Sequence, residues 1–418
     1  MPIRNILVKY DASITTAGER RRSATGRWIL GILSVLLALP VSSATALDGP
    51  CGPSGCAIDA SCDVRCRLGN FWFRGEVLLW WTNGAGNAAL VTTSPPETPP
   101  ELAGRLDQDT TILLAAGDLN PGVASGGRFT VGWWFDDQAA TGLQASYLRV
   151  GSASSRFRAA SPDPLVLARP FTDAVTNTQD ALLIAHPEFL AGAIDVDLDA
   201  RLQGFQLAWR MGVLRGCSYR TDFLVGYRLF EFDERLQINS SAEFTEPRGQ
   251  IIVGSTQQHF DLFDVSNRFH GAELGLVHEH RWGCLTAELA ARVALGGTTA
   301  DVGIDGRTIN TVPGQESFAY SGGLLAQSTN MGWYQVSQFA AVPELNAHLA
   351  YNVTPNLSLM CGYSLIVWPR ALRAADQLDV NLSQLPPEPP GPGRLPQFPA
   401  SQSTFVVQGL QLGLTLVW

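Results

Sequence analysis

The sequence predicts an all-β protein, a closed antiparallel transmembrane β-barrel of about ten strands, with twelve as the alternative count. Three observations lead to this prediction. The chain ends on an alternating apolar strand that finishes at Trp418, it begins with an export signal, and the connections between its predicted strands alternate between long and short. Long outer loops and short periplasmic turns are the layout of an outer-membrane barrel.

Residues 1–46 are predicted to be a signal peptide. A cluster of arginines, Arg20 to Arg22 with Arg27, precedes an apolar run over 28–41, and small residues then lead to a cleavage site after Ala46. Beyond Ala46 we find no apolar stretch of the roughly 18 residues that a spanning helix requires. The exported chain is therefore either secreted and soluble or a closed barrel, because a barrel is the other structure that satisfies its backbone in lipid.

The exported chain is acidic. Removal of residues 1–46 takes away six basic and two acidic residues, so the formal net charge falls from −9 to −13. A protein without a basic patch has nothing to displace the counterions of phosphates, and we expect no nucleic-acid partner.

Residues 47–69 are predicted to be a Cys-rich periplasmic N-terminal extension. Its four cysteines are Cys51, Cys56, Cys62 and Cys66. An oxidising compartment favours a cluster of two disulfides, and zinc is the alternative, although closer C-x2-C pairs are usual for zinc. Farther along the chain, Cys217 and Cys284 fall at neighbouring predicted turns and could also pair.

Residues 70–418 are predicted to form the outer-membrane β-barrel. Runs of alternating apolar and polar side chains mark the strands. We place them near 70–83, 127–137, 141–150, 195–214, 219–232, 267–281, 284–296, 340–352, 356–368 and 404–418. Two further strands, at 157–160 and 300–304, would bring the count to twelve.

Most of these strands carry charge on one face and aliphatic side chains on the other. In a barrel the charged face would line the lumen and the aliphatic face would meet lipid. The candidate lumen charges are Arg74, Glu76, Arg128, Arg228, Glu288, Arg292 and Glu344.

Two further features of the strands lead to predictions, namely a change of apolar phase and the position of the aromatic residues. The apolar phase of the fourth strand shifts at Gly204, which predicts a glycine bulge. Aromatic residues gather near strand ends, as expected of girdles at the two lipid–water boundaries, and packing in a core is the alternative. They are Phe71, Trp72, Phe73, Trp80, Trp81, Trp133, Trp134, Phe135, Trp282, Tyr351, Trp368 and Trp418.

The final strand is similar to the C-terminal signal by which outer-membrane barrels are recognised for insertion. Gln411, Gly413, Leu416 and Trp418 fill its four characteristic positions. This similarity implies the barrel assembly machinery and outer-membrane lipid as partners.

The sequence gives little support for catalysis or for a cofactor. His278 and His280 flank Glu279, but on a strand the two histidines share one face and the glutamate takes the other, unlike the helical HExxH zinc motif. We find no convincing nucleophile and base, and we expect no enzyme activity, no metal and no cofactor.

Several motifs resemble the putative β-barrel porin family numbered seven, which is found in planctomycetes. The segment 70–82 and the following 90–93 are similar to the opening of that family, and further matches include 126–129, 167–171, 322–327 and 342–344. The resemblance covers about 70–418 and implies a barrel located in the outer membrane, without specifying a solute.

Ten strands enclose little free space, because eight leave an interior that side chains just fill and sixteen to eighteen are needed for an aqueous channel. We therefore expect a narrow porin or a structural envelope barrel, which passes small solutes if it is open. The alternative is a secreted all-β adhesin or ligand-binding domain.

Overall fold

The computed structural model describes residues 70–418 except 121, 137–138, 217 and 388–393. The predicted signal peptide and the Cys-rich extension, with its four cysteines, lie outside the described residues. Among the residues that are described, no helix is long and apolar enough to cross a membrane.

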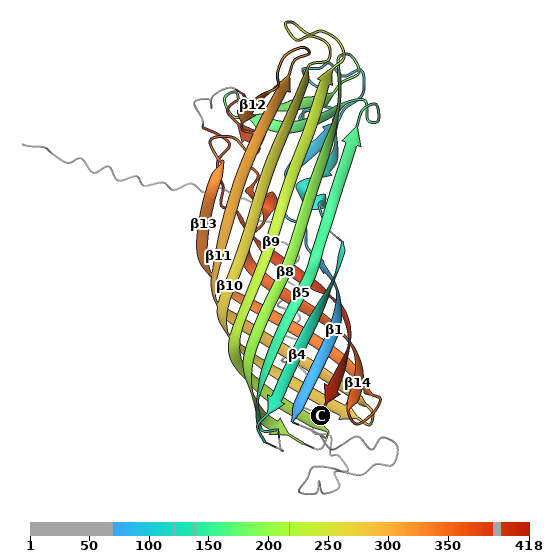
Figure 1. The fold of residues 1–418 in the computed structure, drawn as a ribbon, viewed down its shortest axis with the longest axis vertical. Coiled ribbons are helices and arrows are strands. Elements are labelled where there is room, and N and C mark those ends of the chain that lie inside the picture. Colours follow the sequence, from blue (N-terminus) through green and yellow to red (C-terminus); the bar gives the residue numbers. More distant parts are fainter. Residues whose placement is uncertain (1–69, 121, 137–138, 217, 388–393) are drawn as a thin grey trace, which may run out of the picture. The chain divides into compact units, whose positions relative to one another are not determined.

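Ten antiparallel strands form a closed hydrogen-bonded ring (Figure 1). The ring consists of β1 (Phe71–Thr82), β4 (Val123–Trp134), β5 (Thr141–Ala160), β8 (Leu190–Arg215), β9 (Tyr219–Phe244), β10 (Thr256–Trp282), β11 (Leu285–Thr311), β13 (Gly332–Asn352), β14 (Leu357–Leu372) and β16 (Gln402–Val417). Neighbours in the ring follow the chain, and the last strand pairs with the first. The predicted closed antiparallel barrel is confirmed.

The closure between β1 and β16 fixes the strand number. Phe71 and Trp418 exchange two backbone hydrogen bonds of 3.0 Å, and the pairing continues without a shift from Trp72–Val417 to Thr82–Val407. Residues 157–160 and 300–304, considered above as extra strands, continue β5 and β11 instead. The described ring therefore has ten strands, not twelve.

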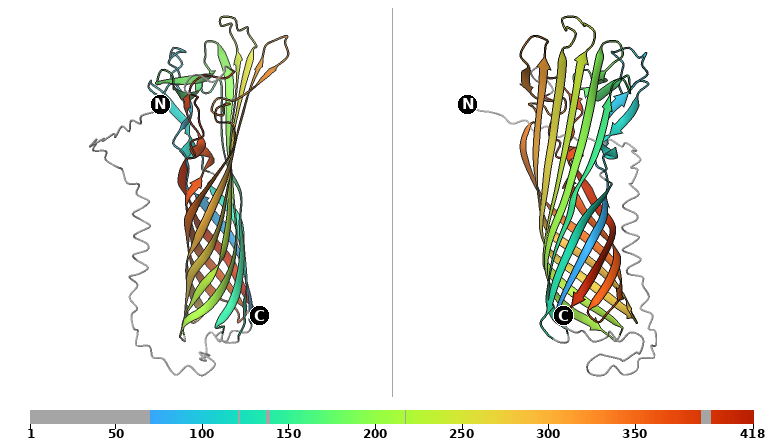
Figure 2. Two further views of the ribbon diagram at one scale, coloured as in Figure 1. Left: turned by 90° about the vertical axis from the view of Figure 1, so that its left-hand side faces the viewer. Right: turned by 45° about the vertical axis from the view of Figure 1, so that its right-hand side comes forward.

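The strands of the ring differ in length, and β5 and β13, with 20 and 21 residues, lie between a short and a long group. Four of them, β14, β16, β1 and β4, have 12 to 16 residues, whereas β8 to β11 have 26 or 27. A membrane crossing needs about 9–11 residues. The long strands therefore extend well beyond the closed ring as an open curved sheet (Figure 2). Much of what the sequence predicted as loops, 233–266 and 297–339, belongs to these strands.

The polarity of the strands inverts where the closed ring gives way to the open sheet. In β8, Ile194, Val196 and Leu198 face inward and are buried, while the aspartates between them face outward. Beyond Gly204 the pattern reverses: Phe205, Leu207 and Trp209 are outward and about 40% exposed, and Gln206 and Arg210 are buried inside.

The predicted bulge at Gly204 is wrong. The pairing of β8 with β9 runs through Gly204–Phe230 without a shift, so the change of phase is this inversion of polarity. The irregularity nearby lies in β5, between Val150 and Ala153. Gly204 has a packing role, because a Cβ there would lie 2.8 Å from the Phe230 ring.

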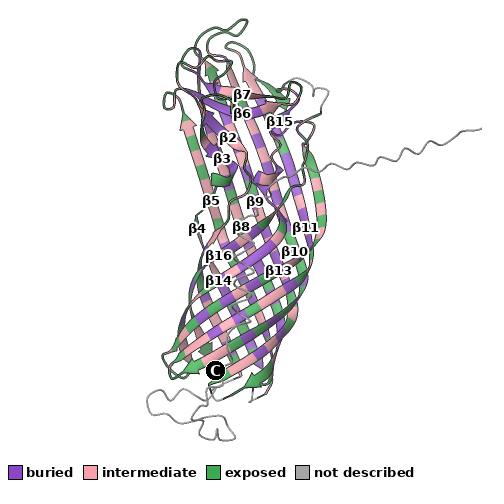
Figure 3. Cartoon of the chain, turned by 180° about the vertical axis from the view of Figure 1, so that it is seen from behind, coloured by how far each residue is buried: buried purple, intermediate pink, exposed green. Residues whose placement is uncertain are grey.

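A cap built from the connections covers the inner face of the open sheet (Figure 3). Its elements are β2 (Ala89–Thr93), β3 (Thr111–Ala115), η1 (Ala116–Asp118), β6 (Leu167–Asp173), β7 (Thr178–Ala185), η2 (Ala374–Gln377) and β15 (Asn381–Leu382), together with the segment 322–331. Leu90, Leu167 and Leu324 of the cap pack with Val196 and Phe263 of the sheet in one buried apolar cluster. A further short strand, β12 (Phe318–Ser321), extends the edge of β11.

The aromatic side chains divide between the two faces. Phe71, Trp133 and Trp418 are outward, exposed by 47%, 47% and 58%, near the end of the ring that carries the short turns. The girdle prediction is wrong for four tryptophans, Trp72, Trp80, Trp134 and Trp368, which face inward and are at most 6% exposed. Adjacent aromatics on a strand necessarily point to opposite faces, so only one of each pair can meet lipid.

Replacing Leu289 with Arg tests whether the outward apolar side chains of the closed ring, here called the apolar belt, face lipid. Leu289 lies on the outward face of β11 between Ala287 and Ala291, with His278 and Ala347 as its cross-strand partners. A cation there would destabilise the barrel by about 2–4 kcal/mol near the bilayer centre. Ser337→Arg, at an exposed position of β13 on the same face beyond the inversion, should change stability little, because its cross-strand partner is Thr299. Denaturant unfolding in lipid vesicles measures both, and equal effects would contradict the assigned belt.

Candidate functional site in the barrel lumen

The closed part of the ring is filled by a layer of charged side chains, here called the ionic layer. All seven candidate lumen charges face inward, at most partly exposed, and the structure brings them into one network. The layer contains the carboxylates of Glu76, Asp222, Glu273, Glu279, Glu288 and Glu344 and the guanidinium groups of Arg74, Arg128, Arg210, Arg220, Arg228 and Arg292.

One half of this layer is organised around Glu288 of β11. Arg74 of β1 reaches across the lumen and donates two hydrogen bonds to Glu288, of 2.7 and 2.8 Å, in a bidentate pair. His348 of β13 contacts Glu288 at 3.1 Å and lies 3.5 Å from Glu76. Gln411 of β16 hydrogen-bonds to the other side of the imidazole and accepts a 2.8 Å hydrogen bond from Ser364.

The other half is organised around Glu344 of β13. Its carboxylate pairs with Arg228 at 2.5 Å, with Arg292 at 3.3 Å and with Arg128 at 3.8 Å, from three different strands. The amide of Asn346 donates a further hydrogen bond of 2.8 Å. Charges this well paired resist separation, because removing one partner leaves an uncompensated buried charge.

The ionic layer leaves almost no open space. The cavity among its side chains has a volume of about 20 Å³. A single water molecule needs about 10–15 Å³ by this kind of measure, so the space holds little more than one. The lumen is occluded at this level.

A second obstruction, here called the aromatic layer, lies next to the ionic layer toward the open sheet. Its largest members are Trp80, Phe230, Phe232, Phe269, Trp368 and Phe405, all 0–1% exposed. Phe232 and Phe405 come from opposite parts of the ring and stack with their ring centres 3.9 Å apart. Apolar side chains in contact across the lumen leave neither a path nor hydrogen-bond partners for a solute.

Two buried ion pairs hold the cap to the sheet beyond the aromatic layer. Arg169 of β6 donates to Asp261 of β10 at 2.7 Å, and Asp261 also accepts the backbone amides of Leu325 and Ala326. Arg373 donates two hydrogen bonds to Glu234 of β9, of 2.7 and 2.6 Å. The cap is thus fixed at two points by charge-assisted hydrogen bonds, which are stronger than neutral ones.

The four residues of the predicted assembly signal divide between the faces of β16. Leu416 and Trp418 are outward and exposed, while Gln411 is buried in the ionic layer. Gly413 lies against β1, where a Cβ would approach the Gly75 carbonyl oxygen to 2.4 Å. The role of these residues in assembly stays a prediction.

Cysteines and histidines outside the ionic layer make no visible reaction centre. Cys284 is disulfide-bonded, whereas its proposed partner Cys217 lies outside the described residues. Glu279 faces the lumen and pairs with Arg210, and His278 faces outward beside Thr221. Within the described ranges, no group of three or more His, Cys, Asp or Glu side chains is arranged to hold a metal ion.

Sequence reasoning missed several members of the ionic layer. Asp222 and His348 lie on strand faces that the alternation already marked as polar, but they were not selected among the candidate lumen charges. Arg210 was hidden by the inversion of polarity, since the inward side of β8 is apolar up to Leu202 and polar beyond it. Glu273 lies between Gly271 and Gly275 on the inward face of β10, and the two glycines interrupt the alternation that would have marked this face.

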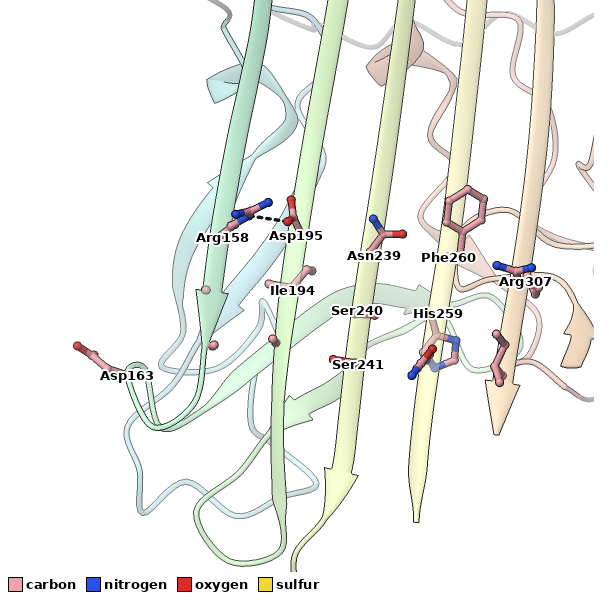
Figure 4. A pocket seen from close by; sticks show the side chains of 15 residues that line it. Arg158, Asp163, Ile194, Asp195, Asn239, Ser240, Ser241, His259, Phe260 and Arg307 are labelled. Atoms are coloured by element: carbon pink, nitrogen blue, oxygen red, sulfur yellow. Dashed lines mark hydrogen bonds and ion pairs between the residues drawn. The ribbon is translucent and has the colours of Figure 1, made fainter. Parts of the chain in front are cut away.

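An open hollow of about 670 Å³ lies near the far ends of the long strands (Figure 4). A row of directly paired residues crosses it from β5 to β11, namely Arg158, Asp195, Asn239, Phe260 and Arg307. Arg158 and Asp195 are joined by an ion pair. Arg158 and Arg307 are exposed, Arg158 pairs with Asp195 and Arg307 lies over the Phe260 ring, so the hollow has the character of a solvated surface.

Comparison with known proteins identifies a family. The family described as Putative beta barrel porin-7 matches residues 72–418. The resemblance noted in the sequence is confirmed, and a planctomycete origin stays an expectation. No curated protein matches the chain.

Solved structures with a similar fold include three outer-membrane or transport proteins. The outer membrane protease OmpT from Escherichia coli is 9% identical, with 84% of this chain and 97% of that chain covered and a TM-score of 0.41. The toluene transporter TbuX from Ralstonia pickettii is 9% identical, with 84% and 90% covered and a TM-score of 0.22. The transport unit of the autotransporter AIDA-I from Escherichia coli is 10% identical, with 87% and 93% covered and a TM-score of 0.22. Similarity at these identities and TM-scores does not indicate a shared activity.

Replacing Glu234 with Gln tests the attachment of the cap. The change leaves Arg373, whose side chain is 2% exposed, without its counter-charge, and should cost about 3–5 kcal/mol locally. We expect faster amide hydrogen exchange over 372–382, with Glu246→Gln, an exposed position, as the control. Unchanged exchange in both variants would show that this ion pair does not hold the cap.

The stability of the cap region should depend on pH through His259. Burial lowers the pKa of His259 to about 4, Arg169 lowers it further and Asp261 opposes the effect. Below about pH 6.5 His259 becomes protonated in the unfolded chain but stays neutral in the folded protein. The free energy of unfolding therefore falls between about pH 6.5 and 4 and no longer changes through this group below pH 4. His259→Gln should flatten this part of a thermal-unfolding profile, and an identical slope in the variant would contradict the assignment.

Proposed function

The chain belongs to the Putative beta barrel porin-7 family, and we propose that this outer-membrane barrel is closed to diffusion and serves as a structural envelope element. The observation that carries the proposal is the double obstruction of the lumen. The ionic layer leaves a cavity of about 20 Å³, and the aromatic layer fills the adjacent cross-section with apolar side chains in contact.

The outer face of the barrel supports the membrane location. A belt of exposed apolar side chains surrounds the closed ring, among them Val131, Leu276, Leu349, Leu410 and Leu412, each 46–55% exposed. A soluble protein rarely exposes so large a continuous apolar surface. This belt argues against the secreted adhesin or ligand-binding domain.

Outside the membrane the barrel presents a polar sheet, here called the platform. It consists of the outward side chains of 153–160, 190–203, 231–244, 256–268, 299–311 and 332–337. The cap packs against the opposite side of this sheet. A closed barrel of this form would display the platform at the cell surface.

A narrow porin is the second candidate function. The feature that favours it is the charged character of the ionic layer, since polar side chains line water-filled barrels. Passage would then require movement of the aromatic layer and of the cap.

We also infer that the protein is not an enzyme. His259 contacts Thr308 and is 6% exposed, and His348 is enclosed in the ionic layer. The other histidines, His186, His270, His278 and His280, contact a backbone carbonyl or amide, a tyrosine, a threonine or another ring, with no accessible carboxylate beside them in the described part of the chain.

Planar bilayers test the closed state directly. The purified protein, shown to be folded by heat-modifiable gel migration, should insert without discrete conductance steps. Reproducible steps would instead support the narrow porin.

A pair of engineered cysteines gives a second readout of the same state. In a Cys361→Ser background, Ser364→Cys, in the ionic layer, should resist a membrane-impermeant thiol reagent, whereas Ser337→Cys, on the platform, should react. The background variant corrects for other cysteines. Rapid labelling of both positions would contradict an occluded lumen.

A further inference from the structure

The platform contains one strongly exposed aromatic side chain in polar surroundings. Trp333, near the start of β13, is 82% exposed. It lies six residues from Phe339, the nearest outward apolar side chain of β13, which corresponds to about 20 Å along a strand. Charged rows that contain Arg268 and Asp301 separate Trp333 from the apolar belt, so lipid contact does not account for its exposure.

The indole has a defined position on the sheet. Gly303 of β11 is its direct cross-strand partner, and a Cβ on Gly303 would lie 2.9 Å from Cζ3 and 3.0 Å from Cη2 of Trp333. The six-membered ring therefore covers the glycine on one side and is open to solvent on the other. Tyr334 points to the opposite face, stacks on Phe398 at 4.2 Å and donates to the Asn330 carbonyl, which fixes this part of the strand.

Polar groups of several kinds surround the free side of the ring. Asp264 of β10 pairs directly with Gly303 across the sheet. Within the described residues it makes no hydrogen bond or ion pair, and burial raises its pKa. In the next row, Asp301 accepts from Gln335 at 2.8 Å and pairs with Arg268 at 3.2 Å. These side chains line a hollow of about 380 Å³.

This combination matches the chemistry of a sugar ring. A hexopyranose has an apolar face of C–H groups that can stack on an aromatic ring, and its hydroxyl groups donate to carboxylates and accept from amides and guanidinium groups. A cationic ligand fits less well, because Arg268 pairs with Asp301 and the positive charge of Arg235, the cross-strand partner of Asp264, acts on that carboxylate. A protein partner would be expected to need apolar neighbours around the tryptophan, and here they are Gly, Asp and Gln.

We propose that Trp333, with Asp264, Asp301, Gln335 and Arg268, forms a binding site for a neutral hexopyranose unit of a glycan. Trp333 stacks on the ring, and Asp264 accepts hydrogen bonds from its hydroxyl groups. The site goes beyond the closed-barrel function and does not require an open lumen. Its height above the apolar belt allows the glycan to be part of the membrane surface or to come from solution.

Two probes distinguish these sources, with the full chain in phosphatidylcholine nanodiscs. Cellohexaose, followed by tryptophan fluorescence and calorimetry, represents a soluble glycan. Purified lipopolysaccharide added to the nanodisc lipid, with bound copies counted by native mass spectrometry, represents a membrane glycan. Saturable binding of either probe supports the site and assigns its source.

Matched variants locate the binding. Trp333→Ala and Asp264→Asn should each weaken binding about tenfold or more, and Trp333→Phe should retain part of it. Gly303→Val, which displaces the indole without removing it, should also weaken binding. Asp305→Asn, an exposed carboxylate one row farther along β11, is the control and should bind normally.

Three outcomes would overturn the proposal. The first is that neither glycan binds saturably. The second is that Trp333→Ala binds a glycan as tightly as the unaltered protein does. The third is that tetramethylammonium binds saturably and neither glycan does. Heat-modifiable migration of each variant shows that a loss of binding does not come from failure to fold.

Discussion

The pairing of β1 with β16 is the constraint on which the rest of the structure depends. In lipid every backbone donor and acceptor needs a partner within the protein, so the first and last strands must meet. Closure with ten strands sets an interior that side chains can fill. The charges that line it are then close enough to pair across the lumen, as Arg74 does with Glu288 and Arg228 with Glu344. Occlusion is thus a consequence of ring size as much as of residue type.

The same strands serve two environments. Toward the short turns their outward side chains are apolar and their inward ones charged, and toward the loops both assignments reverse without a break in the hydrogen-bond ladder. The inward apolar side chains of the open sheet need something to cover them, and the cap does so. The four short strands end before the open sheet and leave the space in which the cap lies. The length of the strands, the inversion of polarity and the presence of the cap therefore depend on one another.

The sequence was sufficient to predict the ring but not the sheet beyond it. Strict alternation identified β1, β4 and β16 and the faces of Arg74, Arg128 and Glu344, because one face of a membrane strand is uniformly apolar. The outer halves of β9 to β11 were taken for loops, since their outward residues, such as Asp233, Arg235 and Asp264, read as solvated turns. The Gly204 bulge was inferred from a phase change that in fact marks a change of solvent. Contacts such as Arg373 with Glu234 join residues 139 positions apart and leave no local signal.

The origin of the cap from separate connections has a consequence for how the protein folds. Its parts come from the segments between β1 and β4, β5 and β8, β11 and β13, and β14 and β16. Contacts between these segments join residues far apart in the chain. Closing the long loops between them costs conformational entropy, so these contacts are expected to form late in folding. The interior of the open sheet must therefore remain uncovered until the last strand is in place. We expect the cap to consolidate in a separate, slower step after the ring has formed.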